Sequence, residues 1–339
     1  MTENALRALL MAGLLGFTAC GTDTATSSPT PTSPPPTSRV TTTTEALPPV
    51  AANELGDVPV LMYHRIIENP VSVYDRTAAD FRAELERLAK ERYVPVTTAD
   101  YAAGKIDIPA GTHPVVLTFD DGDPTQFSLT PEGKPAPGTA VAIMLEVAGR
   151  HPGFRPVASF YVNGDPFGDP GGRKTLPWLR DHGMEIGNHT LTHANLRKAG
   201  ADGAQRDISR GDQAIRQAAP GVEPATIALP FGIHPSDPAL AASGGSDGLT
   251  YRYRGVLLVG ANPAPSPYST RFDPLRIPRI RSQAGSGKEA QFGSTVWLDK
   301  LAANADGRYT SDGAPDRIAY PRAAGQSVQA AYQDRAEPY

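Results

Sequence analysis

The fold is decided by residues 115–122, which read VVLTFDDG. The first five residues form an apolar strand that runs directly into Asp120, Asp121 and Gly122. In a parallel α/β fold, functional sites assemble at the carboxyl ends of the strands. Two adjacent carboxylates repel each other there unless a cation or a shared proton stabilises them. Asp-Asp-Gly is also good turn chemistry, so the string alone leaves a turn and a site equally open.

Short apolar strands recur on both sides of this string. Thr77 is expected to cap a helix whose apolar residues recur at helical spacing, and two more helices are predicted over 139–150 and 176–182. Residues 123–138 are rich in Pro and Gly and are typical of a loop. The alternation of strands and helices indicates a parallel α/β fold. The other predicted strands are 58–63, 93–96, 158–162, 185–187, 226–229 and 255–259.

A second polar string, NHTLTH, occupies residues 188–193. Histidines four residues apart lie on one face of a helical turn, which suits two imidazoles that bind one metal ion. By themselves, two such histidines are more often surface or helix-capping residues. With the carboxylates of the first string, His189, His193 and one Asp supply three ligands. Three ligands leave an open position, as in catalytic rather than structural zinc sites.

The two strings, residues 118–122 and 188–193, resemble the first two motifs of the NodB-type polysaccharide deacetylases. The resemblance runs over roughly residues 58–300 and includes the third motif at 229–232. The opening string at 60–65 is most similar to the branch that acts on poly-N-acetylglucosamine-type polymers. The resemblance implies a distorted, incomplete (β/α) barrel. It also implies an enzyme that hydrolyses N-acetyl groups on a cell-wall or exported polysaccharide.

The same resemblance implies a role for each matching residue. Asp120 would be the general base, and Asp121, His189 and His193 would hold a divalent metal, most simply zinc. The metal would polarise the acetyl carbonyl and acidify the attacking water. The backbone N–H of Phe231 would help to stabilise the oxyanion.

The chain departs from the family pattern at two places. Ala228 stands where the third motif has an Arg that orients the catalytic Asp, and an arginine from another strand could replace it: Arg252, Arg254, Arg276 or Arg279. The family's late His, the general acid, has no counterpart because no His follows His234. His64, at the end of the first predicted strand, is our predicted substitute, with His234 as second candidate. The alternative for His64 is a local bond that stabilises the strand end.

Two other functions remain open at this stage. An O-acetyl esterase on the same fold would need no strong general acid, since alkoxides leave more easily than amines. A non-catalytic glycan-binding module could keep the metal ligands alone. Retention of Asp120 favours an enzyme, because a binding module needs only the ligand set.

The N-terminal region predicts export. Residues 9–17 form a short apolar run, and Cys20 follows it as in a bacterial lipoprotein signal, with a simple cleaved signal or an uncleaved anchor as alternatives. Residues 21–50 are a Thr/Ser/Pro-rich segment predicted to be a disordered spacer. We expect a catalytic domain over 51–305 and a loose C-terminal extension over 306–339. The protein would be lipid-anchored on the outer face of the membrane, with no other membrane segment, or secreted.

Composition excludes two further features. The 339 residues carry a net charge of −4, which does not suit a nucleic-acid-binding face. The chain has a single cysteine, so it cannot form an intrachain disulfide. The expected partner is an acetylated polysaccharide.

Overall fold

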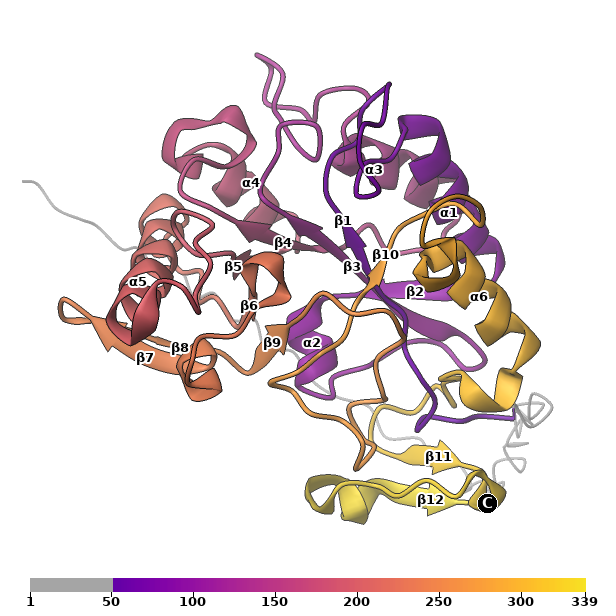
Figure 1. Cartoon of the computed structure of the whole chain (residues 1–339). Helices are drawn as coiled ribbons and strands as arrows, with labels where there is room; N and C mark the ends of the chain where they lie inside the picture. The colour runs from indigo at the N-terminus through magenta and orange to yellow at the C-terminus, as the bar shows by residue number, and fades with distance from the viewer. Residues whose placement is uncertain (1–50) are drawn as a thin grey trace, which may run out of the picture. The chain divides into compact units, whose positions relative to one another are not determined.

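The structure is a computed structural model that describes residues 51–339 (Figure 1). The predicted signal segment, Cys20 and the predicted spacer lie outside the described residues. Within residues 51–339, no helix is both long and apolar enough to cross a bilayer.

An eight-stranded parallel sheet forms the centre of this unit (Figure 1). Strand β3 is the longest strand, and its two halves have different neighbours: β2 pairs with its first half and β1 with its second half. The remaining strands follow in the order β3-β4-β5-β6-β9, and β10 lies on the other side of β1. The strands are β1 Val60–Tyr63, β2 Tyr93–Val96, β3 His113–Asp120, β4 Ser159–Val162, β5 Glu185–Asn188, β6 Thr226–Ala228, β9 Gly255–Leu257 and β10 Ile280–Arg281.

One short segment bends the sheet back on itself. Ile277 forms a parallel bridge with Leu257 of β9, and three residues later Ile280 pairs with Leu61 of β1. The segment therefore bonds to both edges of the sheet. Because β2 branches off this path and only some strands are followed by a helix, the result is a distorted, incomplete (β/α) barrel. The predicted fold class is confirmed.

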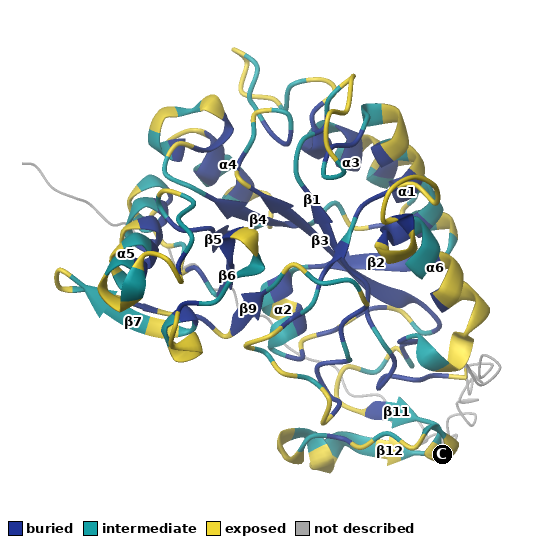
Figure 2. Ribbon diagram, in the orientation of Figure 1, coloured by how far each residue is buried: buried dark blue, intermediate teal, exposed yellow. Residues whose placement is uncertain are grey.

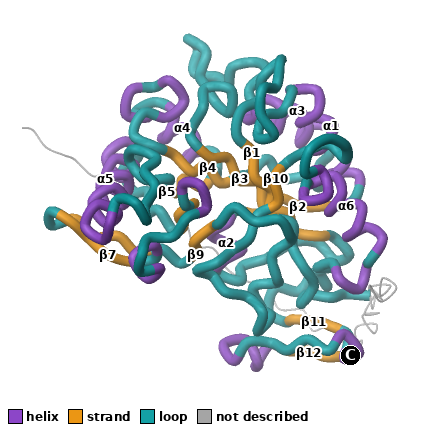
Figure 3. The backbone as a smooth tube through the Cα atoms, viewed as in Figure 1, coloured by secondary structure: helices purple, strands orange, loops and turns teal. Residues whose placement is uncertain are grey.

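Six helices accompany the strands within residues 51–339 (Figure 3). Thr77 caps the first of them, since its hydroxyl accepts a hydrogen bond of 3.0 Å from the backbone N–H of Asp80. Helix α5 was not anticipated from the sequence, because its buried face carries only two large apolar residues, Ile208 and Ile215, among small and polar ones. The helices are α1 Ala78–Lys90, α2 Thr98–Ala102, α3 Ala140–Arg150, α4 Thr175–Asp181, α5 Gly200–Ala218 and α6 Ser294–Ala303.

The strands separate two apolar clusters, because successive side chains of a strand point to opposite faces. Tyr63, Phe119 and Phe160 stack with ring centroids 4.9–5.0 Å apart on the helix-covered face. Val60 and Val116 belong to the other cluster, inside the barrel. The sheet is buried throughout its centre, whereas the helices expose their outer faces (Figure 2).

The C-terminal segment is packed rather than loose. Tyr309 and Ile318 are fully buried and Val328 nearly so, and all three belong to the cluster inside the barrel. Strands β11 (Ile318–Tyr320) and β12 (Ala336–Pro338) pair in parallel beside it. The prediction of a loose extension is wrong, because a few well-placed apolar side chains are enough to dock a polar segment.

Candidate active site

The predicted site residues come together at one edge of the sheet. His64 follows β1, Asp120 ends β3, His189 follows β5 and Phe231 lies just beyond β6. The strands are parallel, so these positions share the carboxyl end of the barrel. Gln126 joins two of the strand ends, since its side-chain amide donates to the backbone carbonyls of both His64 and Asp120.

Asp121, His189 and His193 form a compact group of possible metal ligands. Their ligand atoms all lie within 4.8 Å of one another. Asp121 Oδ1 is 3.4 Å from His189 Nε2 and 3.5 Å from His193 Nε2. Ligands about 2.0–2.1 Å from a tetrahedral zinc ion lie about 3.3–3.4 Å apart, so the observed separations suit an ion between them.

A second bond sets the tautomer of His189. Its Nδ1 lies 2.7 Å from the carbonyl oxygen of Ala228, so Nδ1–H donates and Nε2 presents its lone pair to the ligand group. A metal-binding histidine usually has such a partner on its other nitrogen. The donor set and its orientation therefore fit a divalent cation.

The histidines do not lie on a helix. Residues 189–199 form a loop after β5, in which Thr190 and His193 adopt left-handed backbone conformations with φ of 65° and 56°. Asn163 holds the loop by donating from its side-chain amide to the carbonyls of His189, at 2.7 Å, and Thr190, at 3.0 Å. The predicted helical turn is wrong: a tight loop, not helical periodicity, brings the two rings to 4.9 Å.

Arg279 supplies the guanidinium that Ala228 lacks. It makes a two-pronged bond to Asp120, with Nη1–Oδ1 and Nη2–Oδ2 both 2.7 Å, and its side chain is fully buried. Its Nε donates to the carbonyl of Leu258 at 2.8 Å. Among the four arginines considered from the sequence, Arg279 is thus the one that reaches Asp120.

Two opposing effects act on the pKa of Asp120. Burial alone would raise the pKa, because only 2% of the residue is exposed. The charge and hydrogen bonds of Arg279, together with nearby His189 and His64, outweigh burial and hold the pKa well below its usual range. The carboxylate is therefore ionised at neutral pH.

His64 lies beside the Asp120–Arg279 pair. Its Nε2 is 4.0 Å from Asp120 Oδ2, and its ring packs against Tyr74 with centroids 4.9 Å apart. Burial lowers the pKa of His64, and the carboxylates of Asp120 and Asp121 oppose this effect. Nothing in the sequence pattern indicated Tyr74, which belongs to the loop between β1 and α1.

Phe231 borders the ligand group. The residue is 58% exposed, and its ring meets the His193 ring edge-on at 4.7 Å. Its φ of 60° bends the chain after β6, and within residues 51–339 its backbone N–H has no hydrogen-bond acceptor. His234 is not brought into this group, since its charged neighbours are Arg276, Arg197 and Asp273.

Comparisons with known proteins point to polysaccharide deacetylases. Residues 154–246 match the family model "Polysaccharide deacetylase", a range that includes both histidines and Phe231 but not the Asp-Asp string. The chitooligosaccharide deacetylase of Sinorhizobium fredii (strain NBRC 101917 / NGR234) is 32% identical over 127 residues, or 38% of this chain and 51% of that protein. That of Rhizobium leguminosarum bv. phaseoli is 32% identical over 130 residues, 38% of this chain and 49% of that protein.

Solved structures of deacetylases are also similar. Streptococcus pyogenes deacetylase PplD, in complex with acetate, is 19% identical with a TM-score of 0.49. The match covers 67% of this chain and 92% of PplD. IcaB from Ammonifex degensii is 20% identical with a TM-score of 0.46, over 68% of this chain and 94% of IcaB.

The sequence matches confirm the resemblance seen in the motifs: residues 154–246 match the polysaccharide deacetylase family model, and the chain is similar to chitooligosaccharide deacetylases. The chain spans about half the length of the curated relatives that it matches.

Proposed function

We propose that this protein is a metal-dependent hydrolase that removes N-acetyl groups from a cell-wall or exported polysaccharide. The observation that carries the proposal is the position of Asp120, which is buried, ionised and paired with Arg279 beside the Asp121, His189 and His193 ligand group. A binding module would need the ligands but not the buried pair.

The three ligands would hold a divalent ion, most simply zinc. When bound, the ion supplies Lewis acidity to the acetyl carbonyl and to the attacking water. The remaining work falls to the residues of the chain. Asp120 accepts the proton of the attacking water, and Arg279 fixes the direction in which the carboxylate faces.

Two further groups are available for the oxyanion and for the leaving amine. The free backbone N–H of Phe231 is available to donate to the oxyanion. His64 is within 4.0 Å of Asp120 and is our proposed donor of the proton that the leaving amine requires. An O-acetyl esterase remains the second candidate, because a good leaving group would make His64 dispensable.

Acetate release and metal content test this proposal together. We expect the zinc-loaded protein to release acetate from N-acetylated chitooligosaccharides, and His189→Ala to lose both zinc and activity. His182→Ala, which removes an exposed histidine, is the matched control and should change neither. A His189→Ala protein that binds zinc as tightly as the wild type would refute the ligand assignment.

We further propose, from the sequence alone, that Cys20 carries a lipid that anchors the protein on the outer face of the membrane. Cys20→Ser should move the protein out of the membrane fraction or block its maturation. A processed variant that stays in the membrane fraction would contradict this.

A further inference from the structure

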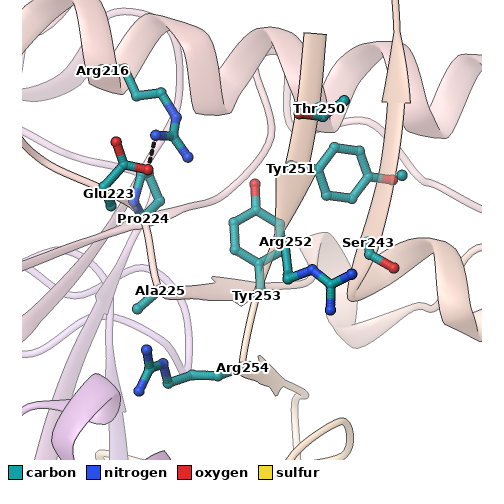
Figure 4. A pocket seen from close by; sticks show the side chains of 11 residues that line it. Arg216, Glu223, Pro224, Ala225, Ser243, Thr250, Tyr251, Arg252, Tyr253 and Arg254 are labelled. Carbon is teal, nitrogen blue, oxygen red and sulfur yellow. Dashed lines mark hydrogen bonds and ion pairs between the residues drawn. The ribbon is translucent and has the colours of Figure 1, made fainter.

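A cavity of about 810 Å³ lies between the end of α5, the start of β6 and an antiparallel hairpin, away from the candidate active site (Figure 4). The hairpin consists of β7 (Ser243–Ser246) and β8 (Leu249–Arg252). Pro224 and Ala225, just before β6, and Arg254, just before β9, also line the cavity. The cavity thus lies at the amino ends of these strands, whereas the catalytic residues follow the carboxyl ends.

The lining of this cavity is positively charged. It contains three arginines and a single carboxylate, Glu223, which is already paired with Arg216. Arg216 also pairs with Asp212, one turn earlier on α5. Arg252 and Arg254 are exposed, and Figure 4 draws no ion pair for either of them. Because the whole chain is negatively charged, this local excess of positive charge is a property of the cavity and not of the surface in general.

The guanidinium groups of Arg252 and Arg254, which form no ion pair within residues 51–339, are separated. In Figure 4 the side chain of Arg252 extends toward Ser243, whereas that of Arg254 extends to the opposite side, beside Ala225. Ser243 is the residue paired with Arg252 across the hairpin, so no carboxylate lies directly opposite Arg252. One small anion could not bridge two groups directed apart, but a chain with repeated anionic groups could engage both. The hydroxyls of Ser243 and Thr250 add neutral hydrogen-bonding groups to the lining.

We propose that this cavity binds a segment of an anionic glycan, with successive carboxylate or phosphate groups on Arg252 and Arg254. Guanidinium groups recognise both kinds of anion through paired, charge-assisted hydrogen bonds. The choice of a glycan over other polyanions rests on the proposed function, since the active site would act on a polysaccharide. Binding here holds the protein on an anionic polymer without occupying the catalytic end of the barrel.

Calorimetric binding with chelator present tests the site without turnover. The probes are a ten-residue oligogalacturonate for carboxylates and a poly(glycerol phosphate) of similar length for phosphates. The Arg252→Gln/Arg254→Gln double variant should weaken binding of at least one probe about tenfold or more, since it removes two charge-assisted contacts. Monomeric galacturonate should bind far more weakly than the oligomer, because it can engage only one arginine.

The matched control is Arg173→Gln/Arg322→Gln, which removes the same charge from two exposed positions. It should bind the oligomer within about twofold of the wild type, since screened distant charges contribute little. Equal losses in both double variants would overturn the proposal in favour of a general charge effect. Oligomer and monomer binding of equal strength would also overturn it.

Two further outcomes are decisive. Binding of phosphatidylglycerol vesicles with neither glycan bound would assign the surface to a membrane and reject the glycan.

Acetate release from a short neutral substrate should be unchanged in the Arg252→Gln/Arg254→Gln variant, which also shows that the variant is folded. The two proposals can fail separately. If the protein is not a deacetylase, no acetate is released, but the glycan still binds and its binding still depends on Arg252 and Arg254.

Discussion

At Asp120, burial and a single arginine compete for control of one carboxylate. The side chain is almost completely enclosed, which by itself favours the neutral acid. Arg279 outweighs that effect with two parallel hydrogen bonds. A carboxylate held in this way is a weak base, so the proton transfer that we propose depends on an acidified water rather than on a strong base.

Arg279→Met should be strongly destabilising, because it leaves the Asp120 charge buried without a partner. Breaking a buried ion pair from one side costs about 3–5 kcal/mol. The free energy of unfolding in urea measures the effect. Arg276→Met, three residues earlier and largely exposed, should stay within about 0.5 kcal/mol of the wild type. Similar losses in the two variants would mean that the Asp120–Arg279 pair contributes no more to the free energy of unfolding than an exposed arginine does.

His64 should matter more for amides than for esters. An amine must be protonated before it leaves, whereas an activated ester needs little help at that step. His64→Ala should therefore reduce N-deacetylation about 10²-fold or more, and hydrolysis of an activated acetyl ester much less. His234→Ala, which removes the second candidate acid, should change neither rate appreciably. Equal losses on both substrates in His64→Ala would indicate a structural role for His64 instead.

Among the elements, α5 has the most direct influence on the candidate metal site. The helix backbone contacts the histidine loop: the Asn188 side chain donates to the carbonyl of Ile208 at 2.9 Å, and the Leu191 N–H donates to that of Asp207 at 3.1 Å. The approach is possible because Gly211 has no side chain. A β-carbon there would lie only 2.6 Å from Asn188 Oδ1.

Gly211→Ala should therefore destabilise the protein by about 1–3 kcal/mol, the usual effect of overpacking, although Ala favours helices. It should also weaken zinc binding, because α5 can accommodate the methyl group only by displacing the loop that carries His189 and His193. Gly149→Ala is the control: it lies in helix α3 with open space around its β-carbon, and it should be neutral or slightly stabilising. Urea unfolding and zinc titration measure the two effects. Unchanged zinc affinity in Gly211→Ala would show that α5 does not set the loop position.

At the scale of the whole molecule, the C-terminal segment closes the end of the barrel opposite the active site. His113 begins β3 and lies almost buried beneath this segment, where its Nδ1–H donates to the carbonyl of Tyr309 at 2.7 Å. Glu54 accepts bonds from the hydroxyl of Tyr309 at 3.1 Å and the backbone N–H of Ala319 at 2.9 Å. Two ionisable groups therefore join the segment to the barrel.

His113 by itself predicts a loss of stability in acid, whereas Glu54, whose pKa burial raises to about 7, acts in the opposite direction. Burial lowers the pKa of His113 from 6.5 to about 4, with the charges of Arg308 and Arg92 acting in the same direction. The unfolded chain takes up the proton near pH 6.5, but the folded protein resists it until about pH 4. The contribution of His113 is thus complete above pH 6.5 and is lost as the pH falls toward 4, by about 2–3 kcal/mol.

Comparison with His113→Gln isolates this contribution, because glutamine keeps a donor for Tyr309 but does not titrate. The stability of the wild type relative to the variant should fall by about 2–3 kcal/mol between pH 7 and pH 4 in urea unfolding experiments. For the exposed His182, the same comparison with His182→Gln should give a difference that does not vary with pH. A pH-independent difference for His113 as well would exclude this group as a source of acid sensitivity.

Short-range patterns were sufficient for seven of the eight strands of the central sheet, all but β10, for α1 and for the choice of candidate site residues. Thr77 and the apolar spacing behind it specify α1 locally, and the strand that precedes Asp120 is apolar along its length. The relation among Asp120, Asp121 and the two histidines was also accessible, because each follows a strand and parallel strands end at one edge.

Tertiary structure alone decided the features that depend on how the sheet closes. Arg279 is 159 residues from Asp120, and it reaches that carboxylate only because the segment at 277–281 bonds to both β9 and β1. The loop that carries His193 is held by Asn163 and α5, which bond to His189, Thr190 and Leu191. The C-terminal segment docks through three scattered apolar residues that form no periodic pattern. Periodicity encodes local structure, whereas a partner distant in sequence is fixed only when the whole sheet is assembled.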